Sequence, residues 1–596
     1  MDRSRRRQGA HGALIETLPA WLPSAAIVVL VVAMGWQRRF ITDDGLIYTR
    51  VVHQLLDGEG PVFNAGERVE TYASPLWLAI VACAKAVFSW STAEWLSVLL
   101  GLAMTALGVA AASFGAASLA GDGRVGRRLL VPFGSLVVAC LPPFWDFTTS
   151  GLETGLEFAW LGGSFATLAA SCRRASPARS HPWMAATLLG VGPLVRPDFA
   201  IFSATFLMAL VVVSGRRRPA STVRLLLVAA APATAYQVFR MGYFAALVPN
   251  TALAKEASSS RWGQGWRYAV DLLGPYWLWL PMTLVGGVAV TMVVSELRDR
   301  RWGRGAVLAA PMVGAILYGA YVVRLGGDFM HGRMLLPAVF AAMMPLFVVE
   351  FPSKAAPRTR SPVMVVAAGA VVLWAAASGL WLRPVTDDFG GTGTGGIEDQ
   401  RVLWQTLTGQ EHPVVADDYA FFVADMADLG RRAGDRRILI LRPIDPPGTQ
   451  TAELPLVERI RPSGVVTETV IGARGVTVGR RVHVVDLHGL ADPIASRLVL
   501  TRRGHPGHEK ILPLSWVVAR FADPSARSVG KGLPRRDQIS AARAALRCSP
   551  LRDLLDAVET PLTPSRVLRN IWRSVGFTRQ RIPVEPSMAE ESLCGP

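Results

Sequence analysis

The chain has 596 residues, of which 51% are hydrophobic, and its formal net charge at pH 7 is +17. Its mean hydropathy of +0.32, together with recurring runs of about 20 apolar residues, excludes an ordinary soluble globular protein. The positive charges lie in short clusters between these runs and form no continuous basic stretch, so we expect no nucleic-acid partner.

The apolar runs begin at residue 20 and end near residue 382, and short basic clusters alternate with polar loops between them. Basic clusters of this kind are typical of the cytoplasmic loops of membrane proteins. They occupy residues 5–7, 127–128, 173–174, 216–218, 300–301 and 354–360. The pattern predicts a cytoplasmic N-terminus and a first crossing at residues 20–36, which stays as an anchor. It also predicts outward loops at residues 37–74, 145–149, 196–198, 243–268 and 326–333.

The number of crossings follows from the same alternation. Residues 75–88 form a short apolar run that carries Lys85, so we interpret them as an interfacial or re-entrant helix. Residues 95–119 are too few to cross twice at about 20 residues per crossing. We therefore predict a polytopic α-helical membrane protein with about eleven transmembrane helices.

Beyond residue 382 the composition becomes that of a soluble domain. A Gly/Thr-rich linker at residues 390–396 precedes β-rich runs at residues 437–441 and 481–486. Amphipathic helical segments follow at residues 538–546 and 552–558. We predict two parts: a transmembrane domain at residues 1–382 and an extracytoplasmic mixed α/β domain at residues 383–596.

The five cysteines divide between these two parts. Cys83, Cys140 and Cys172 fall in or beside apolar runs, where they are expected to be packing residues. Cys548 and Cys594 lie in the exported part, where oxidation is permitted. We predict that these two form a disulfide that closes the C-terminal tail onto its domain; the alternative is two free thiols.

Two adjacent carboxylates, Asp43 and Asp44, open the first outward loop. Because like charges at a membrane surface repel each other, one of the two is expected to have a raised pKa unless a cation lies near. That property suits a general base or a metal ligand, and a divalent cation is compatible with the pair. The alternative interpretation is structural, since Thr42 or Asp43 could cap the helix that follows.

Other ionisable residues fall on the same predicted side of the membrane. Arg196, Lys255 and Arg333, together with His331, are candidates for binding a phosphate or assisting acid–base chemistry. A further set of polar residues, in the outward loops and the exported part, could support the site or contact an acceptor. This set comprises Glu70, Glu153, Asp198, Asp328, His508, Glu509 and Lys510. The alternatives are charged side chains that extend to the interface from helix ends and, for residues 508–510, a structural turn.

Several motifs are absent from the sequence. It contains no GxSxG elbow, no HExxH pair and no Walker A loop. No predicted cytoplasmic loop is long enough to bind a nucleotide sugar. A donor whose phosphate sits at the interface and whose polyprenyl tail lies in the membrane fits the distribution of charged residues better.

Four stretches of the chain resemble one enzyme family: DDGLI at residues 43–47, GPVFNAGERVE at 60–70, GGDFMH at 326–331 and GHEK at 507–510. They are similar to the AftB-like terminal β-arabinofuranosyltransferases, which are GT-C glycosyltransferases that use polyprenyl-phosphate sugars. The resemblance runs from the first helix to the C-terminal tail. It implies a GT-C-type catalytic membrane domain, with Asp43 and Asp44 as its catalytic carboxylates, and a C-terminal domain that could bind carbohydrate.

The implied reaction takes place at the outer face of the plasma membrane of actinobacteria. Arabinofuranose would pass from decaprenyl-phosphoryl-arabinose to the ends of cell-wall arabinan in arabinogalactan or lipoarabinomannan. A β donor that gives a β linkage requires retention, by a carboxylate nucleophile or by attack on the same face. Tyr72 departs from the nearest arabinosyltransferases. The alternatives are another polyprenyl-phosphate sugar, or a non-catalytic transporter or assembly factor for a lipid-linked sugar.

Overall fold

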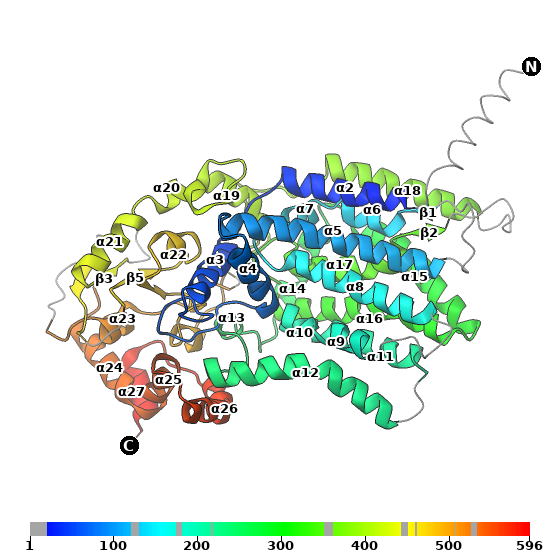
Figure 1. Cartoon of the computed structure of the whole chain (residues 1–596). Coiled ribbons are helices and arrows are strands. Elements are labelled where there is room, and N and C mark those ends of the chain that lie inside the picture. The colour runs from blue at the N-terminus through cyan, green and yellow to red at the C-terminus, as the bar shows by residue number, and fades with distance from the viewer. Residues whose placement is uncertain are drawn as a thin grey trace, which may run out of the picture.

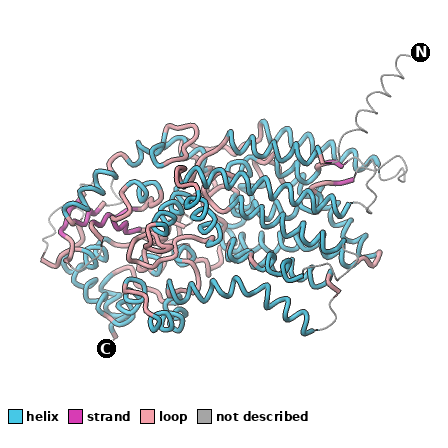
Figure 2. The backbone as a smooth tube through the Cα atoms, viewed as in Figure 1, coloured by secondary structure: helices cyan, strands magenta, loops and turns pink. Residues whose placement is uncertain are grey.

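The computed structural model describes residues 21–120, 130–173, 182–215, 219–350, 361–442, 451–458, 462–505, 507–525 and 533–595. The predicted basic clusters at residues 5–7, 127–128, 216–218 and 354–360, and Arg174, lie outside these ranges. The helices of the apolar region lie side by side at one end of an elongated molecule (Figure 1). The C-terminal elements form the other end, and loops collect where the two parts meet (Figure 2).

The first part is built almost entirely from helices. In chain order these are α2 (Leu22–Gln37), α3 (Asp43–Leu56), α4 (Pro75–Val87), α5 (Ala93–Ala120), α6 (Phe133–Ala139), α7 (Pro142–Phe147), α8 (Thr154–Arg173), α9 (Pro182–Gly190), α10 (Gly192–Val195), α11 (Ala200–Val213), α12 (Pro219–Phe244), α13 (Asn250–Ala254), α14 (Trp262–Leu273), α15 (Trp279–Arg298), α16 (Trp302–Leu325), α17 (Leu336–Met343) and α18 (Ser361–Leu380). One short antiparallel pair, β1 (Leu130–Val131) with β2 (Val349–Glu350), joins two of the loops.

Among the described residues, four helices are long and apolar enough to cross a membrane: α5, α12, α15 and α16. Shorter apolar helical segments accompany them, at Leu22–Gln37, Pro75–Val87, Pro182–Val195, Pro197–Val213, Arg333–Leu346 and Val366–Leu380. The predicted class, a helical membrane-type protein, is confirmed. The predicted number of about eleven crossings and the predicted interfacial position of α4 stay predictions.

Close packing of α5 against α8 fixes the start of α8. A Cβ atom added to Gly108 would lie 2.4 Å from the carbonyl oxygen of Phe158, and one added to Gly162 would lie 2.1 Å from that of Gly108. Only glycine allows backbones to approach so closely, as is common between helices in membranes. The close approach continues to the loop that precedes α8: a Cβ atom on Gly101 of α5 would lie 2.2 Å from the carbonyl oxygen of Thr148, and one on Gly45 of α3 would lie 2.5 Å from that of Ser150. The candidate site lies at this loop.

The C-terminal part combines helices with one small sheet. Its helices are α19 (Gln400–Thr408), α20 (Ala420–Val423), α21 (Met426–Arg436), α22 (Ala473–Thr477), α23 (Leu514–Phe521), α24 (Arg536–Arg547), α25 (Ser549–Glu559), α26 (Pro564–Arg579) and α27 (Pro586–Cys594). Its strands are β3 (Ile438–Leu441), β4 (Ala452–Pro455), β5 (Gly464–Glu468) and β6 (Val482–Asp486), in the order β4-β3-β5-β6. The pairing of β4 with β3 is antiparallel and the other two pairings are parallel. The predicted mixed α/β character, and its predicted strands and helices, are confirmed.

The sheet joins two hydrophobic cores because successive side chains of a strand point to opposite faces. Ile440 and Val466 belong to the large core that continues into the membrane helices. Leu439 and Val465, their neighbours in sequence, belong to a second core beneath α23 and α24. The two parts therefore pack on a shared core at this sheet. The domain boundary between residues 382 and 383 stays a prediction.

The predicted disulfide between Cys548 and Cys594 is present, with the two Cα atoms 5.0 Å apart. Cys548 lies between α24 and α25, and Cys594 is the last residue of α27. The bond therefore fastens the C-terminal helix to the helical layer over the sheet. Cys83, Cys140 and Cys172 are free thiols.

We expect Cys594→Ser to destabilise the protein by about 2–4 kcal/mol, since the disulfide no longer restricts the unfolded chain. The apparent unfolding midpoint of the full chain in detergent, measured by intrinsic fluorescence, should fall. Cys83→Ser, which removes an exposed free thiol, is the matched control and should leave the midpoint unchanged. Equal midpoints for the wild type and Cys594→Ser would contradict the assignment.

Candidate functional site

The start of α3 is held against the loop that precedes α8. Thr42 is the N-cap of α3, since the backbone N–H of Gly45 donates to its Oγ1 at 3.1 Å. The backbone N–H and the hydroxyl of Thr42 both donate to the carbonyl oxygen of Ser150, at 3.0 and 3.1 Å. The capping alternative is therefore correct for Thr42. Because Thr42 caps the helix, the side chains of Asp43 and Asp44, its first two residues, are available for other contacts.

Asp43 faces the C-terminal part of the chain. Its two carboxylate oxygens accept hydrogen bonds from the backbone N–H groups of Gly472 and Ala473, at 2.9 and 2.8 Å. A Cβ atom on Gly472 would lie 1.9 Å from the carbonyl oxygen of Asp43, so this approach requires glycine. Burial raises the pKa of Asp43 to about 7, although the two hydrogen bonds oppose the increase. Asp43 thus connects the membrane part to α22.

Asp44, by contrast, lines a cavity of about 740 Å³ between the helix ends and the C-terminal part. Burial raises the pKa of Asp44, and the nearby Asp328 and Glu153 carboxylates add to the increase, while Lys255 and Arg333 oppose it. Seven of the predicted site residues line this cavity: Asp44, Glu153, Arg196, Asp198, Lys255, Asp328 and Arg333.

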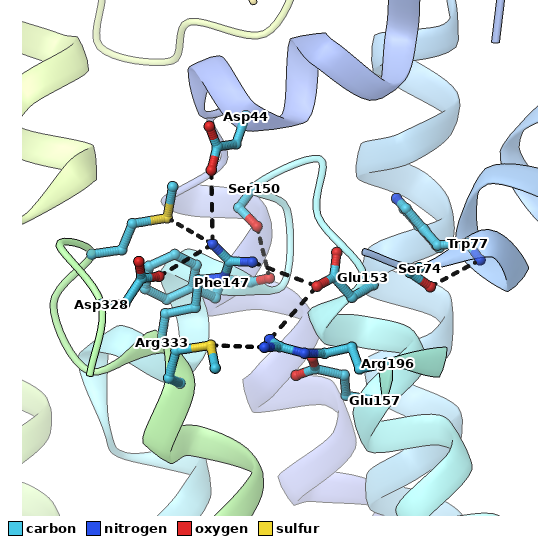
Figure 3. Close-up of polar contacts among 12 residues, drawn as sticks. Asp44, Ser74, Trp77, Phe147, Ser150, Glu153, Glu157, Arg196, Asp328 and Arg333 are labelled. Atoms are coloured by element: carbon cyan, nitrogen blue, oxygen red, sulfur yellow. Dashed lines mark hydrogen bonds and ion pairs between the residues drawn. The ribbon is translucent and has the colours of Figure 1, made fainter. Parts of the chain in front are cut away.

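The guanidinium of Arg333 lies among three carboxylates from distant parts of the chain (Figure 3). Nη1 is 3.3 Å from Oδ2 of Asp328 and 4.0 Å from Oδ2 of Asp44, and Nη2 is 3.5 Å from Oε1 of Glu153. The Arg333 side chain is 9% exposed and that of Asp44 is 23% exposed, so Asp44 is the more accessible from the cavity. A buried guanidinium charge has to be compensated by nearby negative charges, and the three carboxylates provide them here.

Glu153 and Arg196 form a second ion-pair group behind Arg333. The hydroxyl of Tyr48 donates to Oε2 of Glu153 at 3.1 Å. Arg196 contacts Glu153 at 3.6 Å, Glu157 at 3.2 Å and Asp198 at 3.1 Å. Three carboxylates therefore compensate the charge of Arg196, which suits a residue that holds Glu153 in place.

Lys255 and Asp328 form another ion pair in the wall of the cavity. Nζ of Lys255 lies 3.7 Å from Oδ1 of Asp328, and the Lys255 side chain is 32% exposed. Burial alone would raise the pKa of Asp328, but the charges of Lys255 and Arg333 hold it below its usual value. Asp328 is therefore ionised at neutral pH and keeps both cations at the cavity wall.

Glu70 and His331 do not line the cavity. Glu70 is buried and pairs with Arg240 of α12 at 2.6 Å. His331 is also buried, with Nδ1 2.5 Å from Oδ2 of Asp271 and Nε2 3.1 Å from the hydroxyl of Tyr276. Both residues hold segments that surround the site. Their predicted roles in binding a donor or acceptor stay predictions.

His508, Glu509 and Lys510 also lie outside the cavity lining, as Asp43 does. The ring of His508 packs edge-on against Phe329. Glu509 pairs with Arg261 at 2.9 Å, and Nζ of Lys510 donates to the carbonyl oxygen of Leu253 at 3.0 Å. These contacts fasten the C-terminal part to the loops beside Lys255 and are consistent with the structural alternative.

The cavity also contains residues that the sequence analysis missed. Arg579 and Arg581, at the end of α26 and just beyond it, line the cavity together with Tyr48. The sequence gives no local signal for the two arginines, because they reach the cavity only through the docking of α26. Glu157 does not line the cavity but pairs with Arg196 at 3.2 Å. The sequence does give a signal for it, because it follows Glu153 by four residues and such residues share a helix face.

Among the described residues, no group of three or more His, Cys, Asp or Glu side chains is placed to hold a metal ion. The divalent cation that the sequence left open stays a prediction. The arrangement itself brings an accessible carboxylate, a second carboxylate and several cations to one cavity. Such a set can bind an anionic group and exchange a proton beside it.

Comparison with known proteins identifies relatives along the whole chain. The family model "AftB family C-terminal domain" matches residues 457–586. The sequence is 33% identical to "Terminal beta-(1->2)-arabinofuranosyltransferase" of Mycobacterium tuberculosis, over 95% of this chain and 96% of the relative. It is 32% identical to the protein of the same name from Corynebacterium glutamicum, over 94% of this chain and 86% of the relative.

Two solved structures are similar at a lower level. ArnT from Cupriavidus metallidurans bound to undecaprenyl phosphate is 15% identical, with a TM-score of 0.41, over 77% of this chain and 88% of that chain. The apo oligosaccharyltransferase of Archaeoglobus fulgidus is 12% identical, with a TM-score of 0.40, over 78% of this chain and 65% of that chain. These two likenesses are weak.

The two adjacent aspartates should differ in their effect on stability. In Asp43→Asn an amide NH₂ would face one of the two backbone N–H donors of α22, and the unpaired buried donor should cost about 1–3 kcal/mol. Asp44→Asn removes a partly exposed carboxylate with one long ion pair and should cost less than about 1 kcal/mol. Thermal unfolding in detergent measures both variants, and a larger loss for Asp44→Asn would contradict this assignment.

Proposed function

The chain belongs to the family of terminal β-(1→2)-arabinofuranosyltransferases, and we propose that it transfers arabinofuranose from a polyprenyl-phosphate donor to the ends of cell-wall arabinan. The observation that carries the proposal is the cavity in which Asp44 lies 4.0 Å from Arg333, beside the end of the long apolar helix α16. A donor with a phosphate and a membrane-embedded tail needs both features in one place.

Arg333 and Lys255 are the proposed contacts of the donor phosphate, with Arg579 and Arg581 of the C-terminal part. All four line the cavity, and Arg333 provides the planar, charged donor set that suits a phosphate. Arg196 lines the same cavity, but it lies 3.2 Å from Glu157 and 3.1 Å from Asp198, whereas Arg333 is at least 3.3 Å from each of its three carboxylate partners. The Arg196 guanidinium is therefore the more tightly paired of the two. We assign it the role of positioning Glu153, in place of the phosphate contact that the sequence suggested.

The proposed path of the polyprenyl tail follows α16. Tyr321 and Leu325, in the last turns of this helix, line the cavity. Leu317 precedes Tyr321 by four residues, so the three side chains share one helix face. Leu317 is 50% exposed and Ile316 beside it is 70% exposed. This face of α16 is therefore on the surface of the protein, one to two turns away from the cavity. A tail leaving the phosphate along this face enters the membrane.

Asp44 is the proposed catalytic carboxylate and Asp43 a positioning residue. In the transfer, the bond between the anomeric carbon and the phosphate oxygen breaks, and polyprenyl phosphate leaves with the electron pair. The acceptor hydroxyl oxygen bonds to the anomeric carbon, and its proton passes to Asp44. The raised pKa makes the Asp44 carboxylate a better proton acceptor than an ordinary aspartate. Retention requires either a covalent adduct on a carboxylate or attack on the same face.

The proposed location is the plasma membrane, with several crossings and with the cavity and the C-terminal part on the outer face. The arabinan of arabinogalactan or lipoarabinomannan then reaches the cavity from the cell wall. The polar helix ends that line the cavity all fall on the side that the basic clusters predict to be outward. Another polyprenyl-phosphate sugar, or transport without chemistry, remains the alternative to be tested.

We expect purified protein in liposomes to transfer arabinofuranose from synthetic polyprenyl-phosphoryl-arabinofuranose to a short arabinan acceptor. Asp44→Asn should lower kcat about 10²–10⁴-fold, because the proton acceptor is lost. Asp43→Asn should lose less activity than Asp44→Asn at a temperature where both remain folded. Glu59→Gln, an exposed carboxylate of the same loop that does not line the cavity, is the matched control and should keep full activity.

Product analysis by mass spectrometry separates the alternatives. Transfer from a different polyprenyl-phosphate sugar, but not from the arabinose donor, would overturn the substrate and keep the site. Wild-type activity in Asp44→Asn would overturn the site. Movement of the donor across the bilayer without any glycan product would favour a transporter. A glycosyl adduct trapped on the protein would identify the covalent path to retention.

A further inference from the structure

Helix α26 carries an exposed apolar stripe that no other described segment covers. Leu568 is 69% exposed, Trp572 87% and Val575 39%, and their spacing of four and three residues places them on one face. Arg569 and Arg573 are exposed beside this stripe, and Arg573 also pairs with Asp553 of α25. The opposite face is buried against the protein. The helix is therefore amphipathic, with its apolar stripe turned away from the C-terminal part to which it belongs.

The position of α26 is fixed at the end of a long apolar helix. Nδ2 of Asn570 donates to the carbonyl oxygen of Gly242 at 2.9 Å, and the backbone N–H of Leu247 donates to Oγ1 of Thr578 at 2.9 Å. Gly242 is in the last turn of α12, which has 26 residues and is one of the four candidate spans. Figure 1 shows α26 beside this end of α12.

The length of α12 places this contact at the membrane surface. A helix of this length extends about 39 Å, while the hydrocarbon core of a bilayer is about 30 Å thick. The last turns of α12 therefore reach the headgroup layer. Val238 and Phe239, one turn before Gly242, are 50% and 41% exposed, as expected for side chains that face lipid. The apolar stripe of α26 lies next to this lipid-facing surface.

A second helix with the same character lies at the end of another candidate span. In α14, Trp262, Trp266 and Val270 are spaced by four residues and are 56%, 65% and 46% exposed. A Cβ atom on Gly265 would lie 1.7 Å from the carbonyl oxygen of Val323, so α14 packs directly on the last turn of α16. Exposed tryptophans at the ends of spanning helices are typical of the membrane–water interface.

We propose that α26 is an interfacial helix that binds the phospholipid surface of the membrane the protein occupies. Leu568, Trp572 and Val575 enter the boundary between headgroups and acyl chains, and Arg569 and Arg573 lie at the level of the lipid phosphates. The occupant of the stripe is lipid because the stripe continues the lipid-facing surface of α12 and is flanked by arginines.

Helix α26 also connects the membrane surface to the cavity. Arg579 is the last residue of α26 and Arg581 lies two residues beyond it, and both line the cavity. An α26 seated in the interface holds these two arginines at the level of the lipid phosphates. The C-terminal part is then attached to the membrane through its own helix as well as through the packed core.

The test compares tryptophan emission in nanodiscs made with ordinary and with acyl-chain-brominated phospholipid, since bromine quenches only nearby rings. The emission of Trp572 is obtained as the difference between the wild type and Trp572→Leu. We expect brominated lipid to abolish this difference. In the Trp572→Leu background, Leu568→Trp places a second reporter on the stripe and should also be quenched. Arg431→Trp, on the 75% exposed position of α21 at the far end of the molecule, is the matched control and should not be quenched.

Acrylamide, a water-soluble quencher, distinguishes the other outcomes. Quenching of the Trp572 difference by acrylamide but not by brominated lipid would mean that the stripe faces water, and would overturn the proposal. Protection from both quenchers would mean that a second copy of the chain or another protein covers the stripe, and would overturn it equally. Trp572 is 87% exposed, so Trp572→Leu is not expected to disturb folding.

Discussion

The buried guanidinium of Arg333 holds together the parts of the chain that form the cavity. Asp44 comes from the start of α3, Glu153 from the loop before α8 and Asp328 from the loop after α16, and all three meet this one side chain. A charge buried at this depth is tolerated only when opposite charges surround it. Because each partner belongs to a different helix end, the ion pairs also fix how these ends meet. All four side chains line the cavity.

The C-terminal part is attached to this arrangement by contacts that satisfy buried backbone groups. Asp43 accepts from two N–H groups at the start of α22. Arg50, fully buried in α3, donates to the carbonyl oxygen of Val482 at 2.7 Å, and Lys510 donates to that of Leu253 at 3.0 Å. Such contacts explain why the C-terminal part forms one wall of the cavity and supplies Arg581 to it. Its position is set by the same loops that carry the site.

The sequence predicted many residues of the candidate site because they occur at the ends of apolar helices. Basic clusters orient the helices, and the polar residues of alternate loops must then lie on one side of the membrane. Seven predicted residues do line one cavity, although they are spread from Asp44 to Arg333. The sequence contains no signal that distinguishes Asp43 from Asp44. Successive residues of a helix point about 100° apart, so adjacent aspartates face different surroundings, and only the fold decides which one meets the cavity.

The sequence by itself determined the helical membrane class and the mixed α/β character of the C-terminal part. It also predicted the pairing of Cys548 with Cys594 and the group of polar loops that form the cavity. These follow from local composition, periodicity and compartment, which need no knowledge of distant contacts. Only the tertiary structure decided that Glu70 pairs with Arg240 and that His331 pairs with Asp271. Ion-pair partners depend on which helix ends approach each other, and packing across the whole chain sets that approach.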